Sequence, residues 1–237
     1  LGLTETGTTN SKGQSTGLDH IKELGITHIQ LNPVYDYATV DETKLDTNQF
    51  NWGYDPKNYN SPEGSYSTDP YNGDVRVKEF KEMVKTLHDN DISVVMDVVY
   101  NHTYSTDYCY NKLVPDYFYR PGSNGSGCGN DVASERAMVR NFIVDSVAYW
   151  AKEYHIDGFR FDLVGLIDVQ TIKEIRAALD EIDPSIIIYG EGWSMTTTTT
   201  KEGTALSTQT NAVNLGNFGM FNDTIRDAIK GGVFKAK

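Results

Sequence analysis

The stretch GFRFDLVGL, residues 158–166, decides how the rest of the chain is organised. It is an apolar segment that carries one cation, Arg160, and one anion, Asp162. Because side chains alternate along a strand, Arg160 and Asp162 point toward the same face. On an inward face, Arg160 keeps Asp162 ionised through charge attraction and donated hydrogen bonds. An ionised, oriented carboxylate at the end of a strand can act as a nucleophile.

A second carboxylic acid occupies a similar place on the next predicted strand. Residues 185–193, SIIIYGEGW, form an apolar run that leads to Glu191 between two glycines. The separation of Asp162 and Glu191 fits a strand, a crossover helix and the next parallel strand, whose carboxyl ends share one edge of a sheet. Side chains at such ends can hold their carboxyl groups about 5 to 5.5 Å apart, as in a retaining glycosidase.

The composition is that of an ordinary globular domain. With 237 residues, 38% of them hydrophobic and 23% charged, the chain can bury a sizeable core, and no segment of it spans a membrane. A net charge of -12 and a pI near 4.8 argue against nucleic acid as a partner, because no Lys/Arg cluster is present to neutralise phosphates. Cys109 and Cys128 leave a disulfide and two free thiols equally open. Because the chain lacks an initiator Met and a leader, we expect an excised or processed piece.

Predicted strands and helices alternate along the chain, which favours an α/β fold with a parallel sheet covered by helices. About five strands are expected, at residues 26–31, 92–99, 158–162, 185–190 and 212–215. Helices are expected at residues 17–24, 77–90, 134–153 and 171–182, and a last one follows a cap at Asn222 or Asp223. Two long loop insertions, 35–73 and 104–130, separate these elements, and loops of that length usually carry function.

Three short motifs lie in order at predicted strand ends: DVVYNH at 97–102, GFRFD at 158–162 and GEGW at 190–193. Together they resemble the signature regions of the α-amylase superfamily, glycoside hydrolase family 13. NWGYDP at 51–56 and PEGSYS at 62–67 resemble the type I pullulanases of that superfamily. Such enzymes hydrolyse α-1,6 linkages in pullulan and branched starch or glycogen, and the reaction is a retaining double displacement.

The resemblance implies a role for each candidate site residue. Asp162 matches the nucleophile and Glu191 the general acid/base. Arg160 matches the residue that orients Asp162, and His102 matches a histidine that donates hydrogen bonds to the sugar at the cleavage subsite.

Four further residues complete the predicted site. Tyr54 offers a ring face on which a pyranose can stack, and Trp193 helps to exclude water from Glu191. Asp97 and Asn101 are expected to hold the site together by hydrogen bonds rather than to take part in the chemistry.

The resemblance also implies a partial (β/α)8 TIM barrel, in which residues 1–237 form part of one catalytic domain. A closed barrel has eight strands, and about five are predicted, so the first and the last two are not supplied. The superfamily places a third acid after a histidine on a later strand, and no such pair follows Asp223. We therefore expect the chain to need the remainder of its catalytic domain.

The expected partner is an α-glucan polysaccharide or oligosaccharide. No cofactor is expected to be required, and a structural Ca²⁺ ion is compatible with the resemblance. A bacterial, extracellular or cell-surface location is expected. The alternatives are an isoamylase-like or α-1,4-acting hydrolase of the superfamily, a catalytically silent glucan-binding fragment and, more distantly, a sugar-isomerase barrel.

Overall fold

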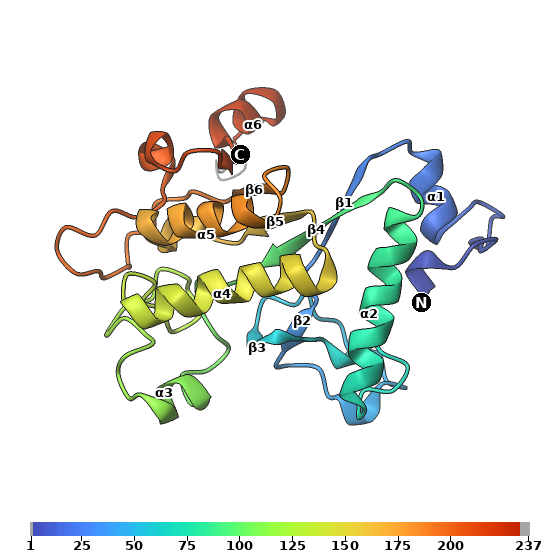
Figure 1. The fold of residues 1–237 in the computed structure, drawn as a ribbon, viewed down its shortest axis with the longest axis horizontal. Coiled ribbons are helices and arrows are strands. Elements are labelled where there is room, and N and C mark those ends of the chain that lie inside the picture. The colour runs from blue at the N-terminus through green and yellow to red at the C-terminus, as the bar shows by residue number, and fades with distance from the viewer. Residues whose placement is uncertain (1, 233–237) are drawn as a thin grey trace.

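The computed structural model describes residues 2–232, and its centre is a five-stranded sheet with the order β1-β4-β5-β6-β7 (Figure 1). All four pairings in this sheet are parallel. Its strands are β1 His28–Leu31, β4 Ser93–Val98, β5 Gly158–Phe161, β6 Ile187–Gly190 and β7 Gly219–Met220. The predicted α/β architecture is confirmed, because helices separate β1 from β4 and every later pair of neighbouring strands except β6 and β7.

Among residues 2–232, six α-helices accompany the sheet, and α4 and α5 lie side by side (Figure 1). They are α1 Gly17–Glu23, α2 Gly73–His88, α3 Cys109–Leu113, α4 Ala137–Tyr154, α5 Val169–Ile182 and α6 Asp223–Lys230. Helix α2 begins earlier than predicted because the Asn72 side chain caps it and accepts from the Asp74 amide at 3.1 Å. Within residues 2–232, no helix has the length and apolar character that crossing a bilayer requires.

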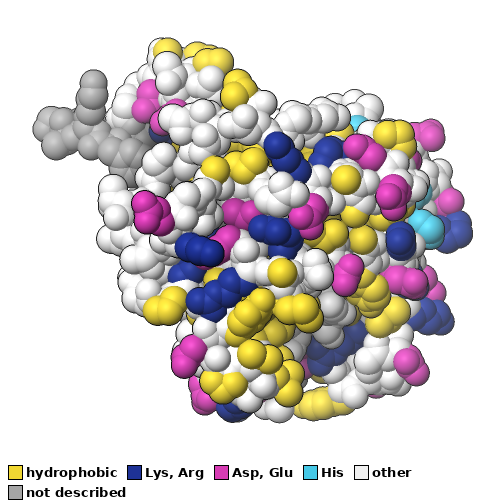
Figure 2. Space-filling model, turned by 60° about the vertical axis from the view of Figure 1, so that its left-hand side comes forward, with side chains coloured by type: hydrophobic (Ala, Val, Ile, Leu, Met, Phe, Trp, Pro, Cys, Tyr) yellow, Lys and Arg dark blue, Asp and Glu magenta, His cyan; other side chains and the backbone are white. Residues whose placement is uncertain are grey.

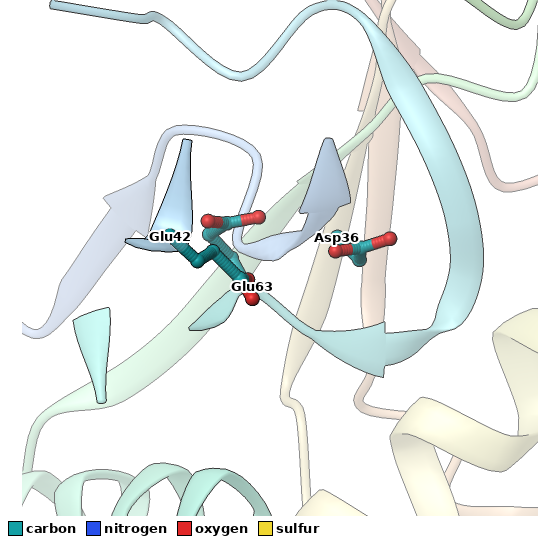
Figure 3. A group of neighbouring side chains, drawn as sticks. All are labelled: Asp36, Glu42 and Glu63. Atoms are coloured by element: carbon teal, nitrogen blue, oxygen red, sulfur yellow. The ribbon is translucent and has the colours of Figure 1, made fainter. Parts of the chain in front are cut away.

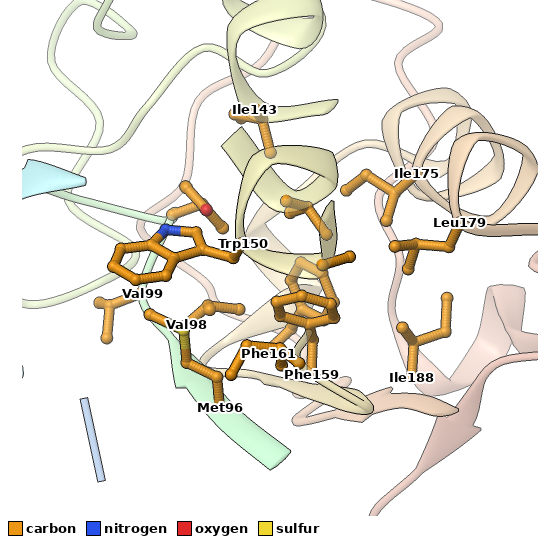
Figure 4. Close-up of a cluster of buried hydrophobic side chains, with 14 of the residues drawn as sticks. Met96, Val98, Val99, Ile143, Trp150, Phe159, Phe161, Ile175, Leu179 and Ile188 are labelled. Atoms are coloured by element: carbon orange, nitrogen blue, oxygen red, sulfur yellow. The ribbon is translucent and has the colours of Figure 1, made fainter. Parts of the chain in front are cut away.

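The core lies between the sheet and helices α4 and α5 (Figure 4). There the helix side chains Ile143, Trp150, Ile175 and Leu179 face the strand side chains Met96, Val98, Phe159, Phe161 and Ile188. Because side chains alternate along a strand, Asp97 and Arg160 point to the opposite face of the sheet. The apolar residues of β4 and β5 thus fix the direction of the charged residues between them.

The strand predicted at residues 212–215 is wrong. Residues 212–214 belong to the 3-10 helix η5, Gln209–Asn214, and the sheet is extended instead by β7. The apolar residues at 212–215 suggested a buried strand, but only Leu215 among them is buried, and Val213 is 91% exposed. Strand β7 itself has two residues, too few for any periodic pattern in the sequence.

The insertion at residues 35–73 is not a plain loop. Strand β2 Tyr35–Tyr37 pairs antiparallel with β3 Pro56–Pro62, and the short 3-10 helices η2 Glu42–Lys44 and η3 Gly64–Tyr66 follow β2 and β3 respectively. Strand β3 begins and ends with a proline, which has no N–H to donate to a neighbouring strand. Such residues fit a two-stranded ribbon, because both of its strands are edge strands. The other insertion, 104–130, contains the short helix α3. The remaining 3-10 helices are η1 Gly2–Thr4 and η4 Val164–Leu166.

Within residues 2–232 the sheet is open, because β1 and β7 each pair with one neighbour. This arrangement agrees with the predicted partial barrel. Cys109 and Cys128 are both free and exposed, so the disulfide alternative is wrong. On the face drawn in Figure 2, acidic and basic side chains are interspersed with apolar ones.

Candidate active site

The predicted site residues meet at the carboxyl ends of β4, β5 and β6. The register pairs Asp97 of β4 with Arg160 of β5, so the two side chains lie at one level of the sheet. Asp162 directly follows β5, and its amide donates to the Val98 carbonyl at 2.9 Å. Glu191 directly follows β6. The end of each strand therefore delivers one acid to the same edge, as the crossover argument predicted.

Arg160 lies at the centre of these acids and forms ion pairs with three carboxylates. Its Nη1 atom lies 2.8 Å from Asp97 Oδ1 and 3.0 Å from Asp162 Oδ1. Its Nη2 atom lies 2.7 Å from Glu191 Oε1. Because one guanidinium holds both Asp162 and Glu191, the two acids predicted to react are kept side by side.

A tight turn after β5 binds the end of β6. The Leu163 amide donates to Glu191 Oε2 at 3.2 Å, and the Gly165 amide donates to the Glu191 carbonyl at 3.1 Å. Leu163 has a φ of 39°, a left-handed conformation that is strained for a residue with a side chain. A Cβ atom on Gly165 would lie 2.0 Å from the Trp193 carbonyl oxygen, so a glycine is needed there. Residues 163–165 after β5 and residues 191–193 after β6 thus form one joint between the two strand ends.

The Asp162 carboxylate is held at both oxygens. Oδ1 binds Arg160, and Oδ2 accepts from Asn101 Nδ2 at 2.9 Å. The same Asn101 nitrogen also donates to the Asp162 carbonyl at 3.0 Å. These contacts restrict Asp162 to one orientation, and its side chain stays 13% exposed, so a ligand can approach it.

His102 is buried beside Asn101 and contacts the protein through both ring nitrogens. Its Nδ1 lies 2.6 Å from Asn101 Oδ1, and its Nε2 lies 3.0 Å from the Tyr54 carbonyl. Burial lowers the pKa of His102 and favours the neutral ring. Both partner atoms are acceptors, so the single N–H of a neutral ring donates to only one of them. A bond from His102 to a sugar hydroxyl would replace one of these contacts, and the sugar contact stays a prediction.

Asp97 is fully buried and serves as the second anchor of Arg160. Its Oδ2 accepts from the Tyr54 hydroxyl at 2.7 Å, while its Oδ1 binds Arg160. Burial raises the pKa of the Asp97 carboxyl to about 6, although Arg160 and Tyr54 both favour the charged form. The bonds described for Asp97 are made with Arg160 and Tyr54, and its supporting role stays a prediction.

Two aromatic rings lie against the guanidinium at the centre of the charged cluster. The Arg160 guanidinium carbon lies 6.0 Å from the centroid of the Tyr54 ring and 5.7 Å from that of Phe221. Trp193, also predicted, is half-buried and has the Arg226 guanidinium 5.8 Å from its ring centroid. The sequence reasoning missed Phe221, which follows β7, because it placed the fifth strand too early.

A second group that the sequence did not reveal is a clamp on the loop that carries Tyr54. Thr39 Oγ1 donates to Asp55 Oδ2 at 2.5 Å and accepts from Asn51 Nδ2 at 2.6 Å. The Thr39 amide donates to the same Asp55 oxygen at 2.9 Å. Asn51 and Asp55 belong to a quoted motif, but Thr39 lies far from it in sequence, so only the fold brings them together.

Three carboxylates form an acidic cluster on the 35–73 insertion: Asp36, Glu42 and Glu63 (Figure 3). Their nearest oxygens lie within 4.8 Å of one another. Glu42 already pairs with Arg76, and Glu63 accepts from the Tyr37 amide at 3.1 Å. Because Arg76 supplies a cation there, these residues are a poor fit for a calcium ion.

Comparison with known proteins agrees with the fold and the motifs. The family model of the alpha amylase catalytic domain matches residues 4–117. A pullulanase of Bacillus subtilis (strain 168) is 46% identical over 100% of this chain and 33% of its own length. Pullulanase from Paenibacillus barengoltzii, solved with maltohexaose and α-cyclodextrin, matches with a TM-score of 0.95 and 53% identity over 99% of this chain and 37% of its own.

A third match is pullulanase from Anoxybacillus sp. LM18-11, solved with maltotetraose. It has a TM-score of 0.93 and 48% identity over 99% of this chain and 35% of its own. The chain thus spans about a third of the length of these relatives.

Proposed function

We propose that the chain carries reacting groups of an α-1,6-glucan hydrolase, because the alpha amylase catalytic domain model matches residues 4–117 and pullulanases match the chain over its whole length. The observation that carries this proposal is the Arg160 guanidinium, which holds Asp162 and Glu191 together at adjacent strand ends. Substrates of this class are pullulan and branched starch or glycogen. Residues 1–237 would form part of one catalytic barrel domain.

In the first step, Asp162 attacks the anomeric carbon of the sugar at the cleaved bond. Glu191 gives a proton to the leaving glycosidic oxygen, so that the C–O bond breaks and a covalent glycosyl ester forms on Asp162. Arg160 and Asn101 hold the two Asp162 oxygens, which removes the need to orient the nucleophile during attack.

In the second step, Glu191 takes a proton from water, and the water oxygen attacks the anomeric carbon and releases Asp162. Each Glu191 oxygen accepts an N–H, from Arg160 and from Leu163. Such donors suit the ionised Glu191 that acts as the base in this step. Two inversions at one carbon give a product with retained configuration.

The change Asp162→Asn tests the assignment of the nucleophile. The amide keeps the shape of the carboxylate but lacks its charge, so we expect pullulan hydrolysis to be abolished and glucan binding to survive. Activity is best measured in a chimera in which residues 1–237 replace the matching third of the Bacillus subtilis pullulanase. Unchanged turnover by the Asp162→Asn chimera would contradict the assignment.

The products identify the linkage and the stereochemistry. We expect maltotriose from pullulan and initial α-configured product by proton NMR. Panose or isopanose would instead identify an α-1,4-acting hydrolase, and initial β-product would rule out double displacement. Binding without release of reducing ends would identify the silent glucan-binding alternative.

A further inference from the structure

Two of the exposed aromatic side chains on the insertion that carries Tyr54 lie in contact with each other. Phe50 is 82% exposed and Trp52 is 63% exposed. Their ring centroids lie 6.1 Å apart at an interplanar angle of 83°, so one ring points its edge at the other. In such a pair, neither face of the ring that presents its edge is covered by the other ring. We call Phe50 and Trp52 the aromatic platform.

The platform is held in place by hydrogen bonds on both sides of Phe50. Gln49 Nε2 donates to the carbonyls of Asp41 and Lys44, each at 3.0 Å, and Gln49 Oε1 accepts from the Asp41 amide at 2.7 Å. On the other side, Asn51 donates to Thr39 at 2.6 Å. These bonds hold the loop on either side of Phe50, so the loop itself does not have to be ordered when a ligand binds to the rings.

The surroundings of the platform indicate the chemistry of its ligand. A hollow of about 240 Å³ adjoins Phe50, and Leu45, Tyr66, Thr47 and Ser65 are among the residues that line it. Residues 47–54 carry no charged side chain. Apolar ring faces beside neutral hydroxyl and amide groups suit an uncharged ligand with an apolar face and a polar rim, which describes a sugar.

We propose that the aromatic platform binds an α-1,4-linked arm of the glucan substrate, outside the site around Arg160. Trp52 lies two residues from Tyr54, a span of at most about 7 Å along the backbone. Tyr54 reaches the charged cluster through its bond to Asp97, so a glucan that passes over Tyr54 can continue onto the platform. This inference rests on the proposed function, because it takes the substrate to be an α-glucan.

The test is calorimetric titration of the chain with maltohexaose and, separately, with α-cyclodextrin. We expect the double variant Phe50→Ala, Trp52→Ala to raise Kd about tenfold, because two stacking contacts are lost. Tyr71→Ala is the matched control, since Tyr71 is 74% exposed on the same insertion but does not line the hollow. All three side chains are exposed, and circular dichroism checks that each variant folds.

An unchanged Kd in the double variant, an equal loss in Tyr71→Ala, or no measurable binding by the unaltered chain would overturn the platform. Sedimentation that shows a dimer broken by the double variant, with glucan affinity unaltered, would identify a second copy of the chain as the occupant instead. Pullulan hydrolysis by the chimera is scored separately. Hydrolysis with an unaltered Kd refutes the platform alone, and platform binding without hydrolysis refutes the proposed function alone.

Discussion

At Arg160, one positive charge serves three carboxylates. Asp97, Asp162 and Glu191 all bind this guanidinium, so the ionised cluster is negative overall. A negative cluster repels anionic ligands and favours a transition state that develops positive charge, such as the oxocarbenium ion of glycoside cleavage. The electrostatics of the cluster therefore support the proposed function.

Asp97 should make stability depend on pH. Its pKa is raised to about 6 in the folded protein, so the folded state binds the proton more tightly than the unfolded chain does. The resulting stabilisation is present below the unfolded pKa of about 3.9 and is lost as pH rises through 6. We expect the unaltered chain to lose up to about 3 kcal/mol relative to Asp97→Asn between pH 4 and pH 7. Urea unfolding at several pH values measures this difference.

The amide of Asp97→Asn does not titrate. The variant therefore serves as the reference for the unaltered chain, and comparing the two isolates the titration of Asp97. The unfolding free energy of the unaltered chain minus that of the variant should fall steadily from pH 4 to pH 7. Parallel curves from pH 4 to pH 7 would show that Asp97 has no raised pKa in the folded chain.

Among the elements, the turn after β5 and the end of β6 form a joint that tolerates no added atom. Gly165→Ala places a Cβ 2.0 Å from the Trp193 carbonyl oxygen, a backbone atom that cannot rotate away. We expect a loss of about 1 to 3 kcal/mol in unfolding free energy and weaker hydrolysis by the chimera, because the turn also holds Glu191. Urea unfolding and pullulan hydrolysis measure the two effects.

Gly73→Ala is the matched control for this joint. Gly73 opens helix α2, and no atom lies within 4 Å of the place where its Cβ would be. An alanine there should leave stability unaltered or raise it slightly. An equal loss from both substitutions would mean that the contact with Trp193 is not the cause.

The elements that the sequence predicts well are those whose burial repeats with a period. Strand β4 is an apolar run, and helix α5 shows its buried residues at helical spacing, so both are found nearly at their true bounds. Strands β2 and β3 lie in an Asn-, Tyr- and Pro-rich segment and pair with register shifts, which erases the alternation. Strand β7 is fixed by its pairing with β6 rather than by its own two residues.

The residues of the candidate site also divide into those on elements with a clear sequence pattern and those on elements fixed by tertiary packing. Asp162, Glu191 and Arg160 lie at the ends of well-predicted strands, so their meeting could be inferred from topology alone. Phe221 and Thr39 come from segments whose position depends on tertiary packing, and the sequence gives no local sign of them. The roles assigned to His102 and Trp193 stay predictions, since the contacts described for them are made with the protein itself.

In the molecule as a whole, the face that carries Arg160 belongs to a sheet with two free edges. Strands β1 and β7 have no second partner among residues 2–232, and the β1 side chains are exposed or only partly buried. Free edges of a parallel sheet attract other strands, and a barrel excludes water from its interior only when it closes. The chain should therefore self-associate at high concentration, or bind segments that complete the sheet.

This leads to a prediction for activity. We expect the chain by itself to hydrolyse pullulan about 100- to 1,000-fold more slowly than the chimera. The family resemblance places a third acid on a later strand, and residues 1–237 do not supply it. Loss of one such electrostatic stabiliser is worth about 2.7 to 4 kcal/mol. Mixing the chain with a separately produced remainder of the Bacillus subtilis pullulanase should restore part of the rate. The same mixture made with Asp162→Asn controls for activity of the remainder alone. Equal rates for the chain and the chimera would mean that residues 1–237 assemble a complete site unaided. The sheet would then be completed by self-association, or another carboxylate of the chain would take the place of the third acid.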